Sequence, residues 1–292
     1  MSSPLYDWFF HEPFHSIFLG TTTCLSLISN GLLLFIIATT NCSNIGPYRY
    51  LLAVFAICDI TTTIGHAAFQ PYLHMTPTGF YFFPRNGQMM ILGRSFDTIF
   101  ALVFIATYYQ TFLVLAYHFY YRYHTVTSGI SRSFTSNWST KHWISISVII
   151  YILYIAGFVG ICAIAFTPTE NTRANVPHEI MQIYGINLTD LRNGFTVISV
   201  KQRDAVSGQW EWHIPSIIGL VGLLSLFGGT ASAIIFCIYK TTSAIRSSDN
   251  HLTAKTRKMQ MDLFFALLIQ TAIPCLFSYL PLATILVFPA IT

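Results

Sequence analysis

Six long apolar runs dominate this chain, and each is long enough to cross a lipid bilayer as a helix. They cover about residues 15–39, 50–73, 96–118, 143–166, 214–239 and 262–283. At a rise of about 1.5 Å per residue, roughly 20 apolar residues span the hydrocarbon layer. The runs are continuously apolar and do not alternate, which predicts helices and not a β-barrel. We therefore expect an all-α polytopic helical bundle with six membrane spans, formed as a single domain by residues 1–292.

The composition supports this assignment. Hydrophobic residues make up 53% of the chain and charged residues only 9%, and the mean hydropathy is +0.57. Soluble domains carry about a quarter charged residues, so this chain lacks the charge that a water-facing surface needs. The net charge of +4 is spread along the whole chain. No basic arm or RNA-binding signature appears, and we expect no nucleic-acid partner.

The distribution of lysine and arginine predicts the orientation in the membrane. The first, third and fifth connections hold nine of the 15 basic residues in a smaller number of positions than the other connections. The positive-inside rule places these odd connections in the cytoplasm and the N-terminus outside. Lys255, Arg257 and Lys258 then mark the inner end of the sixth span. Asn187 begins an N-x-S/T triplet in the long external fourth connection, and it is the glycosylation candidate.

Polar side chains inside the predicted spans are costly and tend to face the interior of the bundle. Asp59, Thr63, His66 and Gln70 fall within about 60° of one another at 100° per residue, so they form one stripe on the second span. Asn30 lies at a similar depth in the first span, where we expect it within reach of a hydrogen bond to Asp59. The sequence leaves two interpretations open: an ion, proton or hinge site, and a polar clamp that packs the two spans.

The third and sixth spans carry further features near their predicted inner ends. Arg122 lies in a tyrosine-rich stretch, a pattern that is typical of an interfacial aromatic belt with one snorkelling arginine. Pro274 and Pro281 interrupt the sixth span, and each removes a backbone hydrogen bond and bends the helix. In the fifth span Gly228 and Ser232 form a face of small residues that predicts close helix approach.

The remaining motifs bound the chemistry. The external connections contain GFYFFPRNG and GQWEWH, which predict either the lining of a ligand entrance or aromatic anchors at the membrane interface. None of the six cysteines lies in an external connection, so no extracellular disulfide framework is expected. HExxH, GxSxG and P-loop motifs do not occur, and we expect neither an enzyme nor a metal or cofactor site.

Four stretches resemble the nematode seven-transmembrane chemoreceptors, especially the Str class and next its sister class Srj. They are GPYRYLLAVFAICDI, AYHFYYRY, SGQWEWH and AKTRKMQMDLFFALLIQTAIP. The resemblance implies a serpentine odorant or chemosensory G-protein-coupled receptor in the plasma membrane of a sensory neuron, in its cilium. It also implies a small-molecule cue as the ligand and a heterotrimeric G protein as the cytoplasmic partner.

The resemblance assigns G-protein contact to the inner ends of spans three and six, at Arg122, Tyr123, Lys255, Arg257, Lys258 and Gln260. It makes Pro274 the bend about which the sixth helix swings outward. Tyr121 stands where rhodopsin-like receptors carry an acidic residue before the arginine, so we expect no ionic lock between neighbouring residues. The family has a seventh span, which does not follow the sixth span here. A truncated non-signalling receptor is therefore the alternative, and a small multi-pass transporter using the stripe from Asp59 to His66 is a third interpretation.

Overall fold

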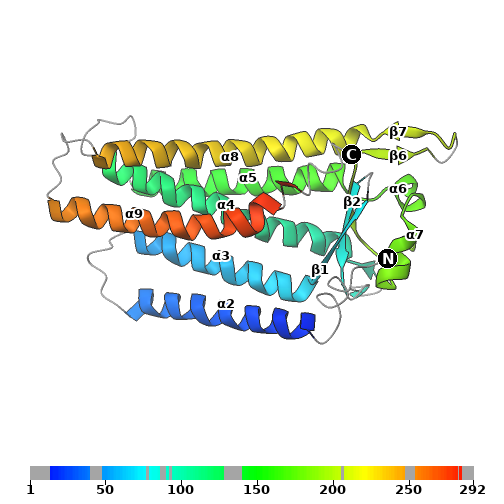
Figure 1. The fold of residues 1–292 in the computed structure, drawn as a ribbon, viewed down its shortest axis with the longest axis horizontal. Coiled ribbons are helices and arrows are strands. Elements are labelled where there is room, and N and C mark those ends of the chain that lie inside the picture. Colours follow the sequence, from blue (N-terminus) through cyan, green and yellow to red (C-terminus); the bar gives the residue numbers. More distant parts are fainter. Residues whose placement is uncertain are drawn as a thin grey trace. The chain divides into compact units, whose positions relative to one another are not determined.

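A computed structural model of the chain describes most of it in two compact units, Met1–Gln70 and Pro71–Thr292 (Figure 1). The described residues are 14–39, 48–76, 79–85, 90–91, 94–127, 140–204, 207–246, 254–281 and 283–284. The described residues of the first unit form the helices α2 (Phe14–Thr39) and α3 (Tyr48–Phe69), which pack against each other.

Helix α3 ends earlier than the second apolar run. Pro71 disfavours helical geometry in the residue before it, and Gln70 takes a left-handed conformation with φ 45°. The Gln70 N–H still donates to the carbonyl oxygen of His66 at 2.9 Å. The predicted span to residue 73 is therefore too long, because residues 71–73 begin a β-strand.

The second unit holds the bundle of α4 (Asp97–Thr127), α5 (Thr140–Ala165), α8 (Ile214–Arg246) and α9 (Ala254–Pro274). Helix α4 contacts all three of the others (Figure 1). Helices α5 and α8 approach closely at Gly219, where an added Cβ would collide with the side chain of Ala165. The small residue predicted for close approach, Gly228, has no heavy atom of a neighbour within 4 Å of such a Cβ. That expectation was wrong in position, because the helix pair meets two to three turns earlier.

Five described helices, α2, α3, α4, α5 and α8, are long and apolar enough to cross a membrane. They match the first five predicted spans, and the polytopic helical bundle is confirmed. The sixth predicted span corresponds to α9 and the π-helix that follows it, η1 (Cys275–Tyr279). Because α9 begins among charged residues, including Arg257 and Lys258, its first turns are much less apolar than the rest.

The change from α-helix to π-helix occurs between the two prolines of the sixth span. Pro274 is the last residue of α9 and has no N–H to donate, so it interrupts the regular hydrogen-bond ladder. The Leu280 N–H bonds to the carbonyl oxygen of Cys275, five residues earlier. One extra residue is thereby accommodated in a wide turn, and Pro281 follows immediately.

At one end of this bundle, the described residues of 71–85 and 167–213 form a small β-rich layer that we call the cap. Strands β1 (Pro71–Thr76), β2 (Gly79–Pro84) and β5 (Thr196–Ser199) make an antiparallel sheet in the order β1-β2-β5. Strands β6 (Lys201–Arg203) and β7 (Trp210–Trp212) form a separate hairpin, and β3 (Met90–Ile91) pairs with β4 (Arg94–Ser95). Two short helices, α6 (Glu170–Ala174) and α7 (His178–Tyr184), complete the cap.

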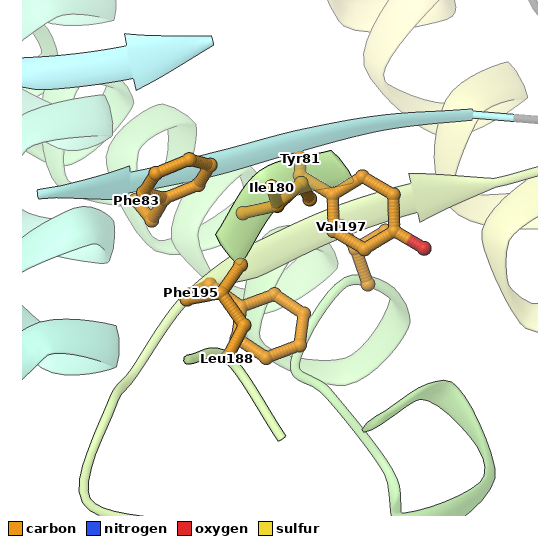
Figure 2. Close-up of a cluster of buried hydrophobic side chains, with 6 residues drawn as sticks. All are labelled: Tyr81, Phe83, Ile180, Leu188, Phe195 and Val197. Atoms are coloured by element: carbon orange, nitrogen blue, oxygen red, sulfur yellow. The ribbon is translucent and has the colours of Figure 1, made fainter. Parts of the chain in front are cut away.

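The cap has a hydrophobic core of its own, shown in Figure 2. Its buried members are Tyr81, Phe83, Ile180, Leu188, Phe195 and Val197. On the other face of β2, the ring of Phe82 stacks on Phe104 of α4 at 5.7 Å between centroids. Both faces of β2 are therefore buried. The segment GFYFFP is neither an open ligand entrance nor a membrane anchor, because its aromatic rings pack the cap and fasten it to α4.

Candidate functional site

At the end of the bundle remote from the cap, one polar contact joins α4 to α9. Arg122 is only 4% exposed, and its Nη1 donates a hydrogen bond to Oε1 of Gln260 at 3.3 Å. We call this pair the arginine contact. Because Gln260 is neutral, the contact is a hydrogen bond from a charged donor to an amide and not an ion pair. The arginine is buried between helices and does not snorkel to the interface, contrary to the aromatic-belt interpretation.

Tightly packed apolar side chains surround the arginine contact. The rings of Phe119 on α4 and Phe264 on α9 meet edge to face at 6.3 Å between centroids. On α8, Thr241 and Ile245 are fully buried at this level. In such surroundings an arginine that lost the Gln260 acceptor would keep little access to water, so removing Gln260 should cost more than removing an exposed hydrogen bond would.

The other residues predicted at this end are placed differently. Nη2 of Arg257 donates to the carbonyl oxygen of Arg246, the last residue of α8, at 3.0 Å. This caps an unsatisfied carbonyl group at a helix C-terminus, where a positive charge is also favourable. Lys258 is exposed, and the side chain of Lys255 lies outside the described residues. Tyr123 faces α8, where its ring lies 6.2 Å from that of Phe236.

Nearer the cap, an aromatic cluster joins α4, α8 and η1. The ring of Phe112 stacks on Phe227 of α8 at 4.7 Å and lies 4.5 Å from the ring of Tyr279 in η1. Tyr279 is 5% exposed. On the α5 side of α4, Tyr109 stacks on Phe158 at 3.9 Å. The side chains of this cluster are aromatic and uncharged, and they pack against one another between the helices.

Tyr279 is a residue that the sequence analysis did not single out. It is the fifth residue after Pro274 and lies in the wide turn that separates the two prolines. π-turns frequently occur at functional sites, but this turn is visible only in the structure, and the sequence offers no more than the two prolines that flank it. Since Gln260 and Tyr279 belong to one continuous segment, that segment contacts α4 at both the arginine contact and the aromatic cluster.

The polar stripe of the first unit is only partly assembled as expected. Asn30 Nδ2 donates to the carbonyl oxygen of Ser26 at 3.0 Å, within its own helix, and not to Asp59. The two helices are instead joined by the hydroxyl groups of Ser26 and Thr63, 2.7 Å apart. Gln70 lies beyond the end of α3 and donates to Ala67. The packing-clamp interpretation is the one that these contacts support.

Two members of the stripe remain: Asp59 is half-buried and His66 is exposed, both on α3. Across the described residues, no group of three or more histidine, cysteine, aspartate or glutamate side chains is arranged to hold a metal ion.

Two charged side chains hold the cap in place. Asp97 joins it to the first turn of α4, and Arg173 holds one of the cap's own loops. The buried carboxylate of Asp97, the first residue of α4, accepts from the Gly194 N–H at 3.1 Å. Nη1 of Arg173 donates to three carbonyl oxygens of the loop between α7 and β5, those of Leu188, Asp190 and Asn193, at 2.9 to 3.0 Å. The cap is thus held by buried polar contacts in addition to its hydrophobic core.

One titratable group lies in the cap where β1 meets α7. Nδ1 of His74 lies 3.4 Å from the hydroxyl oxygen of Tyr184, and the two rings meet edge to face. Burial lowers the pKa of His74, and the nearby carboxylate of Glu179 opposes that effect in part. The folded cap therefore favours the neutral imidazole.

The glycosylation candidate lies on the surface of the cap. Asn187 is exposed, and its Oδ1 accepts from both the N–H and the hydroxyl of Thr189, at 3.1 and 2.6 Å. The asparagine and the threonine of the triplet are thus in direct contact. This geometry presents the Asn187 side chain at an accessible turn.

Comparison with known proteins gives one consistent result. The family model described as "Serpentine type 7TM GPCR chemoreceptor Str" matches residues 15–292. G-protein coupled receptor str-33 of Caenorhabditis elegans is 19% identical over 90% of this chain and 75% of its own length. Serpentine receptor class r-10 of the same nematode is 24% identical over 92% of this chain and 75% of its own length. Serpentine receptor class J-38, also of Caenorhabditis elegans, is 23% identical over 94% of this chain and 78% of its own length. No solved structure gives a significant match.

Proposed function

Because the chain belongs to the Str family of serpentine chemoreceptors, we propose that it is a chemosensory G-protein-coupled receptor for a small odorant-like molecule. In this proposal the cap faces the outside, together with the N-terminus. The arginine contact faces the cytoplasm and a heterotrimeric G protein, in the plasma membrane of a sensory cilium. The observation that carries the proposal is that one segment, α9 with η1, contacts α4 both at the arginine contact and at the aromatic cluster.

The ligand in this proposal is an uncharged molecule that competes for the place of the Tyr279 ring. The cluster around Phe112, Phe227 and Tyr279 supplies apolar area and ring faces. A charged ligand would lose its hydration there without meeting an opposite charge among these three side chains. Aromatic and aliphatic volatile compounds fit this chemistry better than amino acids or sugars do.

Signalling then follows from a shift between two arrangements of α9. When a ligand displaces Tyr279, the π-turn after Pro274 can close into a regular turn. This change rotates α9, which ends at Pro274. Gln260 moves with that helix and leaves Arg122, whose guanidinium group becomes available to the G protein. The exposed Arg257 and Lys258 border the same end of the bundle. The ligand acts only by binding one arrangement more tightly than the other.

The test is a G-protein activation assay on the full chain in membranes, with a panel of uncharged volatile compounds. Arg122→Ala should abolish activation while leaving the amount of protein at the cell surface unchanged. Thr125→Ala is the matched control, because Thr125 is exposed on the same helix turn and its hydroxyl donates to the carbonyl oxygen of Tyr121 within α4. Signalling that survives in the Arg122 variant would contradict the assigned role. A surface-resident native chain that never activates a G protein would support the non-signalling alternative.

A further inference from the structure

The β6–β7 hairpin of the cap has one covered face and one open face. Gln202 is buried, and its Nε2 donates to Oγ1 of Thr172 on α6 at 3.2 Å, so this face rests on α6. Directly opposed residues of an antiparallel pair share a face. The open face therefore carries two cations and two indoles, all exposed: Lys201, Arg203, Trp210 and Trp212.

Both indoles are unusually accessible for large apolar side chains. Trp210 is 62% exposed and Trp212 is 60% exposed. Nζ of Lys201 lies 4.8 Å from the centroid of the Trp212 ring, which fixes a positive charge over an aromatic face. The only carboxylate of the two strands, Glu211, lies on the opposite face. The open face is therefore aromatic and positive.

The two edges of the hairpin also differ. The His213 N–H donates to the carbonyl oxygen of Val200, and the Asp204 N–H donates to that of Gln209, both at 2.9 Å. Because hydrogen-bonded pairs alternate with pairs whose backbone groups point outward, the groups at residues 201, 203, 210 and 212 point away from the partner strand. On β6 the outward groups at Arg203 are occupied. The Asn175 side chain donates to the Arg203 carbonyl oxygen at 2.9 Å and accepts from the Arg203 N–H at 3.2 Å.

On β7 the outward groups are those of Trp210 and Trp212, since these residues stand opposite Arg203 and Lys201. Within the described part of the chain, no residue bonds to the backbone N–H or C=O groups on this edge. An unpaired strand edge is a template for an added strand. The two tryptophans thus supply both the free backbone edge and the aromatic part of the open face.

Lipid is a poor occupant for this edge. About 20 helical residues cross the hydrocarbon layer, so a span counted from Lys240 at the far end of α8 reaches about Leu220. Gly219 packs on Ala165 and Phe166, where the apolar run of α5 ends, which places the membrane boundary at the same level. The fifth apolar run, 214–239, is therefore longer than the hydrocarbon layer is thick: at about 1.5 Å per residue, Ile214 stands about 9 Å beyond the hydrocarbon, and β7 lies further out.

A second copy of the chain is also a poor occupant. Identical strand edges pair with each other only when the strands are antiparallel. Figure 1 shows β7 running along the axis of α8, so two copies with parallel α8 helices in one membrane would also have parallel β7 strands. The edge therefore calls for a different chain.

We propose that the open edge of β7 binds an extended acidic peptide segment, which adds a third strand to the hairpin. Its backbone pairs with the groups of Trp210 and Trp212, as in strand-addition complexes. Its carboxylates lie on the face of the indoles and extend over them toward Lys201 and Arg203, while its alternate, small apolar residues point to the opposite face. The site is separate from the aromatic cluster of the bundle, so it does not depend on the proposed receptor activity.

The test measures peptide binding to the purified full chain in nanodiscs of phosphatidylcholine. The probe is a fluorescein-labelled seven-residue peptide that alternates glutamate with valine, followed by fluorescence anisotropy. A peptide that alternates lysine with valine is the charge control. We expect the acidic peptide to bind at least about tenfold more tightly than the lysine peptide. The double variant K201Q/R203Q should remove most of that preference, whereas Glu211→Gln should not.

A second comparison isolates the backbone edge. Trp210→Pro and Trp210→Thr both remove the indole, but only proline removes the outward N–H. Proline is tolerated on a strand edge where the N–H faces outward, so pairing with β6 is retained. We expect the proline variant to bind the acidic peptide about tenfold more weakly than the threonine variant, because it loses one hydrogen bond to the peptide backbone. Equal binding by these two variants would overturn strand addition.

Two further outcomes would also overturn the proposal. One is the absence of acidic-peptide binding up to about 1 mM, the weak limit of specific association. The other is quenching of the fluorescence of Trp210 and Trp212 by phosphatidylcholine with brominated acyl chains. The fluorescence of these two residues is the difference between the native chain and the W210F/W212F variant. Quenching would place the two indoles in the membrane as anchors. Unquenched indoles together with edge-dependent peptide binding would support the proposal.

Discussion

Replacing Gln260 with leucine tests the arginine contact most directly. Leucine occupies a similar volume but cannot accept the hydrogen bond from Arg122, which is 4% exposed. Hydrogen bonds to charged groups contribute about 1.5–3 kcal/mol, and the 3.3 Å separation argues for the lower end of that range. A loss of about 1.5 kcal/mol from the resting arrangement shifts the equilibrium by roughly tenfold. A receptor that is about 1% active at rest would become about 10% active.

The assay is ligand-free nucleotide exchange by the G protein in membranes, normalised to the amount of receptor at the cell surface. Gln260→Glu should act in the opposite direction, because a carboxylate makes a stronger, charge-assisted contact with Arg122. Basal exchange should then fall below the native level. Met259→Leu is the matched control, since Met259 is exposed and adjacent, and the substitution nearly conserves volume.

The result that would refute this reasoning is a pair of Gln260 variants that move basal exchange in the same direction, or not at all, at equal surface levels. Equal directions would mean that residue 260 matters for packing and not through its bond to Arg122. No change in either variant, with Arg122→Ala inactive, would mean that Arg122 serves the G protein but is not restrained by α9.

Other predictions address the cap. Asn187→Gln should remove one glycan, seen as the loss of a glycosidase-sensitive shift on gels; a native chain without a shift would contradict an external cap. Gly194→Ala should lower stability by about 1–3 kcal/mol through overpacking, because its Cβ would lie 2.6 Å from the Asp97 Cβ; thermal unfolding measures this, with Gly228→Ala as the control. The cap should lose stability as pH falls below about 6.5, because the unfolded chain protonates His74 more readily than the folded cap does. Hydrogen exchange of β1 should show the loss in the native chain, and a loss of equal size in His74→Phe would exclude this histidine as the cause.

The positions of the long helices could be predicted from the sequence because the property that determines them is local. A run of apolar residues enters the bilayer whatever its neighbours are, so five predicted spans coincide with helices of the structure. Pro274 likewise acts on its own backbone, and α9 ends at it. Pro71 acts in the same way on α3, although the predicted span ran through it to residue 73. The family was also identified from local stretches, and the match over residues 15–292 confirms it.

The partners of the side chains could not be predicted in this way, because they depend on how each helix is rotated and which segments meet. Arg122 finds Gln260 across 138 positions of sequence. GFYFFP became a buried strand because β5, more than a hundred residues later, pairs with it. Asn30 turned to Ser26 and not to Asp59, and close approach fell at Gly219 and not at Gly228. Hydropathy places a segment in the membrane, but it does not fix the segment's rotation about its axis. That rotation is set by the packing of all the segments together, and only the tertiary structure decided it.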